Sequence, residues 1–222
     1  PDGAPWRVAV AGDAATIPAR AVVLAGDAPG AADLVRELAP RLAALLAPIP
    51  YPPVVVAALG FGPAGRERLP RGFGVLIPRP EGFRSLGVLW DSHLFPGRGP
   101  KGHLLLRAML GGATDPGAAA LDDEEVVRQV RADLRRLFGV GDEPVFREIV
   151  RWPRAIPQYE LGHAARVRAV EAELAAFSAR SPGLFLAGSF LHGIAFGKAA
   201  RAGAEAGAQA GAISARLAAA RR

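Results

Sequence analysis

Apolar residues follow two spacings along this chain, and the spacings predict strands and helices. Short runs that are apolar throughout or at alternate positions predict strands. Such runs lie at residues 5–11, 20–25, 54–61, 73–78, 85–90, 103–110, 145–152 and 184–188. The run at 20–25 is almost wholly apolar, which is typical of a strand covered on both faces.

Apolar residues at helical spacing predict helices over about 31–46, 122–138, 164–178 and from 197 to the end of the chain. In the first helix, four leucines fall on one face and are expected to point into the core: Leu34, Leu38, Leu42 and Leu45. Pro40 should kink or split this helix, because proline removes a helical hydrogen bond and clashes with the preceding turn.

The second helix carries a start signal, since Asp122 is followed three residues later by Glu125, as in a capping box. Its inward face should consist of Val126, Val130 and Leu134. The four strands between 51 and 112 are separated by Gly/Pro-rich turns without helices, which favours antiparallel neighbours. The predicted fold class is therefore α/β of a mixed α+β kind.

Composition excludes several kinds of protein. The chain has 222 residues, of which 50% are hydrophobic and 22% charged, enough apolar material for a core and unlike a disordered polymer. Cysteine is absent, which excludes disulfides, a thiolate nucleophile and cysteine-based metal sites. The four histidines show neither metal-ligand spacing nor a Ser/His/Asp arrangement, so we expect no metal centre and no hydrolase.

The net charge of +6 does not indicate a nucleic-acid partner. Of the 27 basic residues only Lys101 and Lys198 are lysine, and asparagine does not occur, a skew typical of a GC-rich genome. The arginines are scattered among acidic residues rather than gathered in one block. We therefore expect no nucleic acid among the partners.

No apolar run reaches the ~20 residues that a membrane-spanning helix needs. The opening residues do not resemble a signal peptide. Because residue 1 is Pro rather than Met, we expect the sequence to be a piece of a longer protein.

Three segments could carry chemistry, and the residues alone leave each with two interpretations. The turn at 189–193 joins a strand to a helix whose free N–H groups could face an electron-rich ligand, although any such connection needs small residues. The stretch 151–159 could hold Trp152 or Tyr159 against a flat ligand, or could be a rigid linker. The aliphatic residues of 73–110 suit a flat hydrophobic ligand but are also typical of a core.

The last helix carries Gly203, Gly207 and Gly211 at intervals of four residues. Its charged and polar residues argue against a membrane-spanning dimerisation face. We expect the glycines to pack closely on a sheet.

Four blocks of sequence resemble the C-terminal half of the protoporphyrinogen oxidase family, within the FAD-dependent amine-oxidase-like superfamily. They lie at 71–98, 103–116, 151–163 and 183–203, in the same order and at similar spacing as in that family. The third block, RWPRAIPQYELGH, is the most specific. The resemblance extends over nearly the whole chain.

The resemblance implies a two-domain flavoenzyme. Residues 1–45 and 157–222 would be segments of a Rossmann-like FAD domain, and residues 46–156 an antiparallel substrate-binding domain. Matching positions assign cofactor-binding residues, namely Trp152, Ile194, Ala195 and Phe196. They also assign residues that line a tetrapyrrole pocket, namely Phe73, Gly74, Leu86 and Met109, with Gly74 letting the macrocycle lie close to the backbone. No catalytic side chain is assigned, because the flavin carries the chemistry.

The implied activity is the oxidation of protoporphyrinogen IX to protoporphyrin IX, with FAD as hydride acceptor and oxygen as the final electron acceptor. Coproporphyrinogen III is the alternative substrate. Two further alternatives are a non-catalytic fragment that binds a tetrapyrrole or a partner, and a generic amine-oxidase-like flavoprotein, which the IPQY block disfavours.

The strand–glycine–helix unit that binds the FAD pyrophosphate is expected in an N-terminal segment outside this chain, which would be a partner of these residues. Alone, the chain should bind FAD poorly and be inactive. By the same resemblance we expect a cytoplasmic protein, with peripheral contact to the cytoplasmic membrane as an option.

Overall fold

A computed structural model describes residues 5–13 and 15–219, and the chain divides into two compact units. One unit comprises residues 51–156, and the other combines 1–50 with 157–222. The divisions expected from the sequence, after residues 45 and 156, lie close to these. Residues 1–4, the start of the first expected segment, and 220–222, the end of the last helix expected from the sequence, lie outside the described residues.

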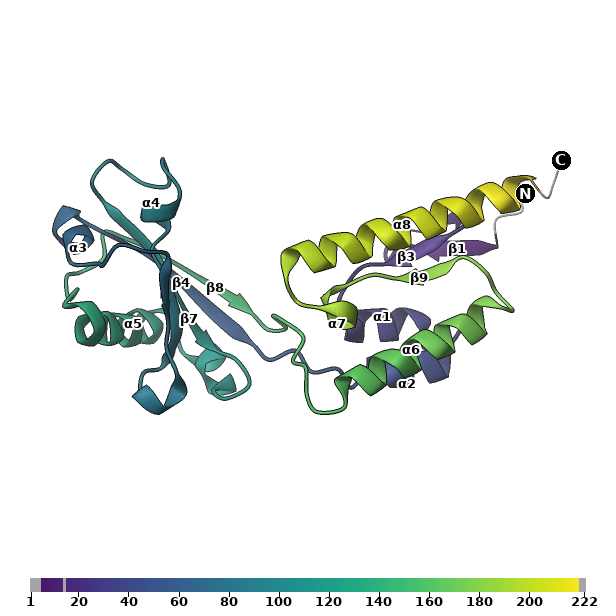
Figure 1. Ribbon diagram of the computed structural model, residues 1–222, viewed down its shortest axis with the longest axis horizontal. Coiled ribbons are helices and arrows are strands. Elements are labelled where there is room, and N and C mark those ends of the chain that lie inside the picture. Colours follow the sequence, from purple (N-terminus) through teal and green to yellow (C-terminus); the bar gives the residue numbers. More distant parts are fainter. Residues whose placement is uncertain (1–4, 14, 220–222) are drawn as a thin grey trace. The chain divides into compact units, whose positions relative to one another are not determined.

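The unit of residues 51–156 is built on a five-stranded antiparallel sheet with the order β5-β6-β7-β4-β8 (Figure 1). Its strands are β4 (Val54–Phe61), β5 (Gly74–Leu76), β6 (Ser85–Leu89), β7 (Leu104–Gly111) and β8 (Phe146–Trp152). Its helices are α3 (Pro63–Glu67), η1 (Arg79–Glu81), α4 (Asp91–Leu94), η2 (Pro116–Ala120) and α5 (Asp123–Phe138). The predicted antiparallel arrangement is confirmed.

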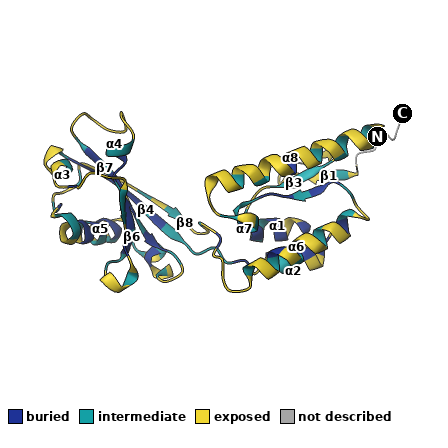
Figure 2. Ribbon diagram, viewed as in Figure 1, coloured by how far each residue is buried: buried dark blue, intermediate teal, exposed yellow. Residues whose placement is uncertain are grey.

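Helix α5 covers one face of this sheet. It begins with the predicted capping box, in which the Glu125 N–H donates to Asp122 Oδ1 at 2.8 Å and the Asp122 N–H to Glu125 Oε2 at 3.1 Å. Val126, Val130 and Leu134 are fully buried, as predicted. They pack against alternate strand residues that are also buried, which Figure 2 shows as the dark blue interior.

A buried carboxylate also ties α5 to the sheet. Asp133 is 1% exposed, and its Oδ2 accepts hydrogen bonds from the Ser85 N–H at 2.9 Å and the Ser85 hydroxyl at 2.7 Å. Gln129 donates to Oδ1 at 3.2 Å. Each carboxylate oxygen therefore has a partner, as a buried charge requires.

The second unit contains two small strand pairs and five helices among its described residues. Its strands are β1 (Trp6–Ala9), β2 (Thr16–Ala19), β3 (Val22–Leu24) and β9 (Leu184–Leu186). Its helices are α1 (Ala28–Val35), α2 (Pro40–Leu46), α6 (His163–Ser178), α7 (Ser189–His192) and α8 (Phe196–Ala219). The parallel pair β3–β9 lies between α8 and α6, so β3 belongs to a layer with helices on both faces, as predicted (Figure 1).

The helix expected over 31–46 is split at Pro40 into α1 and α2, which confirms the predicted effect of the proline. The expected inward face of this helix needs correction, because the split resets the helical phase. Leu34 and Leu38 are therefore exposed, and α1 buries Val35 and its alanines instead. The sequence analysis also missed β2, which is short, contains Pro18 and pairs only with β1.

The prediction for the glycines of α8 is wrong. Gly203, Gly207 and Gly211 are exposed, and a Cβ added to any of them would meet no atom within 4 Å. Ala206 is the buried residue of α8. Among the described helices, none is both long enough and apolar enough to cross a bilayer.

Candidate functional site

The five-stranded sheet has a second face, opposite to the one that α5 covers, which we call the open face. Side chains alternate along a strand, so the residues between the buried ones belong to this face. They are Gly74 and Leu76 on β5, Gly87 and Leu89 on β6, Leu105, Arg107, Met109 and Gly111 on β7, Val54, Val56, Ala58 and Gly60 on β4, and Phe146, Glu148, Val150 and Trp152 on β8.

The open face is predominantly apolar and brings together residues that are distant in sequence. Val56 lies directly opposite Met109 on one side and Val150 on the other. Val54 lies opposite Trp152, whose side chain is 54% exposed. The structure thus places Met109, predicted for the substrate pocket, and Trp152, predicted for the flavin, on one surface.

Gly74 also lies on the open face, and the structure gives a local reason for a glycine there. A Cβ at this position would lie 2.3 Å from the carbonyl oxygen of Val88 and 2.8 Å from Cδ2 of Leu89. The neighbouring strand and the Leu89 side chain therefore occupy the space that any larger residue would need. This packing requires a glycine whether or not a ligand lies above it.

Leu86 lies at a bulge in β6, where the register with β7 shifts between Ser85 and Gly87. Its Cδ1 lies 3.6 Å from where a Cβ on Gly112 would be, so its side chain reaches the end of β7. Bulges redirect side chains, and this position could not be obtained from strand alternation.

Phe73 is a predicted pocket residue that lies outside the strands of the sheet. It immediately precedes β5, and its carbonyl accepts a hydrogen bond from the Trp90 N–H at 3.2 Å. The Phe73 side chain is 66% exposed.

Glycines leave four positions of the open face without a side chain. Each of Gly60, Gly74, Gly87 and Gly111 lies directly opposite an apolar residue of a neighbouring strand. Phe146 leans over Gly60, since a Cβ there would lie 3.0 Å from the Phe146 Cβ, and Leu76 leans over Gly87 in the same way. A floor of low side chains and glycines suits a broad planar apolar ligand.

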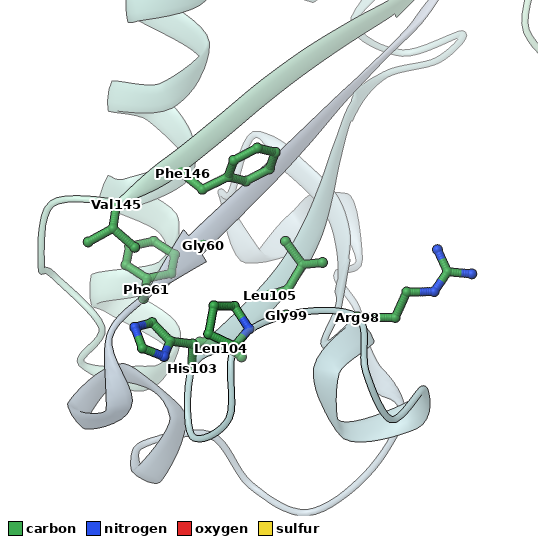
Figure 3. A pocket seen from close by; sticks show the side chains of 10 residues that line it. Gly60, Phe61, Arg98, Gly99, His103, Leu104, Leu105, Val145 and Phe146 are labelled. Carbon is green, nitrogen blue, oxygen red and sulfur yellow. The ribbon is translucent and has the colours of Figure 1, made fainter.

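A pocket of about 380 Å³ opens where β4 ends and β7 begins, and it shares Gly60, Leu105 and Phe146 with the open face (Figure 3). It is lined mainly by apolar residues, with Arg98 and His103 at its margin. Figure 3 shows the Arg98 side chain directed away from the other lining residues. None of the residues predicted from the sequence lines this pocket, and no set of polar groups converges in it.

Gly60, Gly62 and Gly65 have the spacing of a dinucleotide-binding G-x-G-x-x-G, a motif that the sequence analysis expected only outside this chain. Gly60 lies in β4, and the other two glycines follow that strand. The structure excludes that function. β4 is antiparallel to both neighbours, and α3 is only five residues long. Gly65 instead lets α3 pack on Phe61, whose Cβ lies 3.0 Å from the position of an added Cβ. A dinucleotide site needs a parallel βαβ unit and a helix of useful length.

In the other unit, Ile194, Ala195 and Phe196 follow α7 and lead into α8. Ile194 is 54% and Phe196 89% exposed. Gly193 precedes them with φ +138°, and an added Cβ would lie 2.4 Å from Cδ of Lys198. The segment therefore presents apolar side chains and a helix start with unpaired N–H groups.

Tyr159 and His163, both from the IPQYELGH block, form hydrogen bonds to the backbone of this turn. Nε2 of His163 lies 2.9 Å from the carbonyl oxygen of Phe190, so Nε2 carries the proton of this hydrogen bond. The Tyr159 hydroxyl donates to the carbonyl of Ser189 and accepts from the Gly193 N–H. Burial raises the pKa of Tyr159, and the Gly193 hydrogen bond opposes that rise.

The two aromatic rings stack on each other at a centroid distance of 3.9 Å and an angle of 14°. At the end of the turn, His192 Nε2 lies 3.1 Å from Glu171 on α6. These contacts fix α7 at both of its ends. The sequence analysis treated Tyr159 as a residue for a flat ligand or a linker, and in the structure it binds the backbone of the turn.

Comparison with known proteins identifies the family. The profile of the flavin-containing amine oxidoreductases matches residues 2–210. This chain belongs to that family. FAD is accordingly its cofactor, which confirms the expectation from the sequence.

Relatives of this family member include two kinds of porphyrinogen oxidase. It is 32% identical to a chloroplastic protoporphyrinogen oxidase of Oryza sativa subsp. japonica over 191 residues, which cover 82% of this chain and 35% of the relative. It is 34% identical to a coproporphyrinogen III oxidase of Propionibacterium freudenreichii over 182 residues, 82% of this chain and 33% of the relative. The chain thus spans about a third of these relatives' length.

Solved structures share the fold. A protein from Exiguobacterium, provisionally assigned as a protoporphyrinogen oxidase, superimposes with a TM-score of 0.70 at 21% identity, over 95% of this chain and 45% of the other. Cyclohexylamine oxidase of Brevibacterium oxydans superimposes with a TM-score of 0.61 at 19% identity, over 92% of this chain and 45% of the other. The predicted mixed α/β fold of an FAD-dependent oxidase is confirmed.

The residues of this family member fit FAD in part. Ile194 and Phe196 are apolar and exposed, and Gly197 has no atom within 4 Å of an added Cβ, so a ligand could approach this backbone. These residues could contact the flavin ring and its ribityl chain. Among the described residues, the G-x-G-x-x-G spacing at Gly60–Gly65 has no parallel βαβ unit and so supplies no pyrophosphate site.

Proposed function

We propose that this chain is the C-terminal part of an FAD-dependent oxidase that converts protoporphyrinogen IX to protoporphyrin IX with oxygen as electron acceptor. The observation that carries the proposal is the broad, predominantly apolar open face, in a chain whose relatives include protoporphyrinogen oxidases. A tetrapyrrole is a broad, largely apolar disc, and a largely apolar surface with few polar groups suits such a ligand.

When bound, FAD supplies the hydride acceptor: three two-electron oxidations each move one hydride to the flavin and release one proton, and three molecules of oxygen leave as hydrogen peroxide. The contribution of this chain is to bind and orient the substrate. Met109, Leu89 and Val56 would lie against the macrocycle and exclude water from that side. Gly87 and Gly111 keep the floor low, so the disc could lie parallel to the sheet.

At the other unit, Ile194 and Phe196 would contact the flavin, and the Tyr159–His163 pair would hold their turn in place. Both hydrogen bonds from these rings end on backbone carbonyls, so they fix the path of the chain rather than a side chain. This role supports positioning of the cofactor and involves no proton transfer.

Coproporphyrinogen III is a second candidate substrate, which the 34% identity to the Propionibacterium enzyme favours about as well as the 32% identity to the Oryza enzyme favours the first. The two substrates differ in the number of carboxylates at the macrocycle's edge. A group on the open face that binds carboxylates would therefore bear on the choice between them.

The test is to purify the full-length protein that contains this chain and to add each porphyrinogen in air. The porphyrin product fluoresces and the porphyrinogen does not, so the expected result is fluorescence that grows with one of the two. Absence of fluorescence with both, from a protein that shows flavin absorbance, would remove the proposal. A preparation without flavin absorbance would favour a non-catalytic binding fragment.

The isolated 222-residue chain is expected to bind FAD weakly and to give no turnover, which a flavin titration tests. A cytoplasmic location with peripheral membrane contact is also part of the proposal. Fractionation of cells, with a salt wash of the membranes, tests it.

A further inference from the structure

Arg107 stands out on the open face, because its neighbours there are apolar. Along β7 it lies between Leu105 and Met109, and across the sheet it lies opposite Ala58 on β4 and Leu89 on β6. Within the open face as defined, the other charged residue is Glu148, which lies beyond Ala58 on β8. Strand spacing separates Glu148 from Arg107 by roughly 10 Å.

The guanidinium of Arg107 is held in one orientation by Asp91. Nε lies 2.7 Å from Asp91 Oδ2, and Nη2 lies 2.7 Å from Oδ1, which is a bidentate pair. The Asp91 side chain is only 8% exposed, whereas that of Arg107 is 45% exposed. The carboxylate is therefore the buried support, and the guanidinium is the group that reaches the surface.

Asp91 belongs to α4, which is itself anchored to the sheet. The next residue, Ser92, accepts a hydrogen bond from the Leu105 N–H at 3.0 Å through its hydroxyl. Arg66 of α3 donates to the Ser92 hydroxyl at 3.3 Å and to the His103 carbonyl at 3.1 Å. The support of Arg107 is thus part of a network that ties α4 to β7, and the guanidinium cannot easily reorient.

The pair leaves donors unused. Asp91 engages Nε and one hydrogen of Nη2, so the two Nη1 hydrogens and the second Nη2 hydrogen have no partner in this pair. Hydrogen bonding to Asp91 also raises the pKa of Arg107, which stays charged. A charge pair set in an apolar floor carries a desolvation cost that such pairs often do not repay in stability. A ligand carboxylate would use the donors that remain.

We propose that Arg107, oriented by Asp91, binds a propionate carboxylate at the edge of the tetrapyrrole that lies on the open face. The inference rests on the proposed function. Arg107 and Met109 are two residues apart on one strand, or roughly 7 Å. A disc resting on Met109 and Leu89 would therefore place an edge carboxylate within reach of the guanidinium.

The test uses the full-length flavoprotein and two forms of one substrate, coproporphyrinogen III as the free acid and as its tetramethyl ester. Arg107→Met keeps the length of the side chain and removes the donors, and Arg107→Lys keeps the charge without the planar fork. Arg147→Met is the matched control, because Arg147 lies on β8, on the side of the sheet that α5 covers, and pairs with Glu124 at 2.6 Å.

Arg107→Met should raise KM for the free acid by roughly tenfold to a hundredfold, the range for a lost charged hydrogen bond, with kcat little changed. KM for the ester should not change, Arg107→Lys should fall in between, and Arg147→Met should match the unmodified protein. An unchanged ratio of acid to ester KM in Arg107→Met, in an enzyme that still turns over, overturns the inference and leaves the proposed function standing.

Binding can also be measured without turnover. This measurement distinguishes failure of the proposed activity from failure of the carboxylate site. Oxidised coproporphyrin III is titrated into each protein and followed by its fluorescence. If no porphyrinogen is oxidised but the free acid binds and Arg107→Met weakens that binding by a similar factor, the proposed activity fails and the carboxylate site stands. If the unmodified protein neither oxidises nor binds these tetrapyrroles, both are overturned.

Discussion

The two faces of the five-stranded sheet come from the same strands and contain similar numbers of apolar residues, yet they differ in almost every physical respect. On β7, Leu104, Leu106 and Ala108 are at most 1% exposed beneath α5. On the same strand Arg107 is exposed and Met109 is half-buried. The covered face is filled with branched side chains, whereas the open face alternates leucine, valine and methionine with glycine.

This difference shows how a sheet distinguishes a core from a binding surface. The buried charge between α5 and the sheet, Asp133, accepts hydrogen bonds from the protein at both carboxylate oxygens. The charge at Arg107 has donors left over. A core is complete in itself, and a binding surface has flat areas and unused donors that a ligand can meet. The same kind of substitution on the two sides of the sheet should therefore have different effects on stability.

The largest effect is expected from shortening a leucine on the covered face. Leu106→Ala should lower the free energy of unfolding by about 2–5 kcal/mol, because it leaves a cavity under α5. Met109→Ala on the open face should cost less than about 1 kcal/mol. Urea unfolding of both variants measures the difference. Equal losses would mean that the open face is packed as tightly as the core.

Removing a charged side chain should likewise cost more stability between α5 and the sheet than on the open face. Asp133→Ala removes the acceptor of two Ser85 hydrogen bonds and should cost about 2–3 kcal/mol. Glu148→Ala on the open face should change the free energy of unfolding by no more than about 0.5 kcal/mol. Thermal unfolding of the two variants is sufficient, and a large loss with Glu148→Ala would contradict the distinction between the faces.

Much of the covered face could be predicted from the sequence. The strands β4 to β8 and α5 follow from apolar spacing, and the capping box at Asp122 fixed the start of the helix. The predictions failed where the orientation of a side chain depends on the helical phase or on which surface the helix contacts. Pro40 reset the helical phase, so Leu34 and Leu38 became exposed, and the glycines of α8 face away from the sheet that they were expected to contact.

The open face could be predicted only in part. Met109 was identified through a resemblance, and alternation then places it beside Val56 once the register is known. Arg107 could not be found from the sequence, because its partner Asp91 is sixteen residues away and the pairing depends on how β6 and β7 align. Leu86 depends on a bulge, and the roles of Tyr159 and His163 depend on carbonyls about thirty residues away.

A third prediction concerns the glycine floor. Gly74→Ala should cost about 2 kcal/mol, because the added Cβ would lie 2.3 Å from the Val88 carbonyl oxygen and the strands must separate to admit it. Gly99→Ala is the control, since a Cβ there would meet nothing within 4 Å. Chemical unfolding measures both. If Gly74→Ala is as stable as the control, the glycine is present for a ligand and not for packing.

The smallest effect should come from a second Arg–Asp pair, which flanks β6 and β7 and has no residue on the open face. Arg84 precedes β6, and Asp115 follows β7; Arg84 Nε lies 2.8 Å from Asp115 Oδ2. The hydrogen bond from Arg84 lowers the pKa of Asp115 in the folded state. The pair therefore stabilises the fold above the unfolded pKa of about 3.9, and this contribution is lost as the pH falls through the folded value.

Asp115→Asn should lower the free energy of unfolding by less than about 1 kcal/mol at pH 7, because the pair is partly exposed. The difference from the unmodified protein should stay constant down to about pH 5 and shrink below about pH 4. Unfolding curves at several pH values test this. Asp115→Asn should leave the acid-to-ester KM ratio of the flavoenzyme unchanged, since only the Asp91–Arg107 pair presents its guanidinium on the open face. A changed ratio would mean that carboxylate binding depends on the whole β6–β7 edge rather than on Arg107.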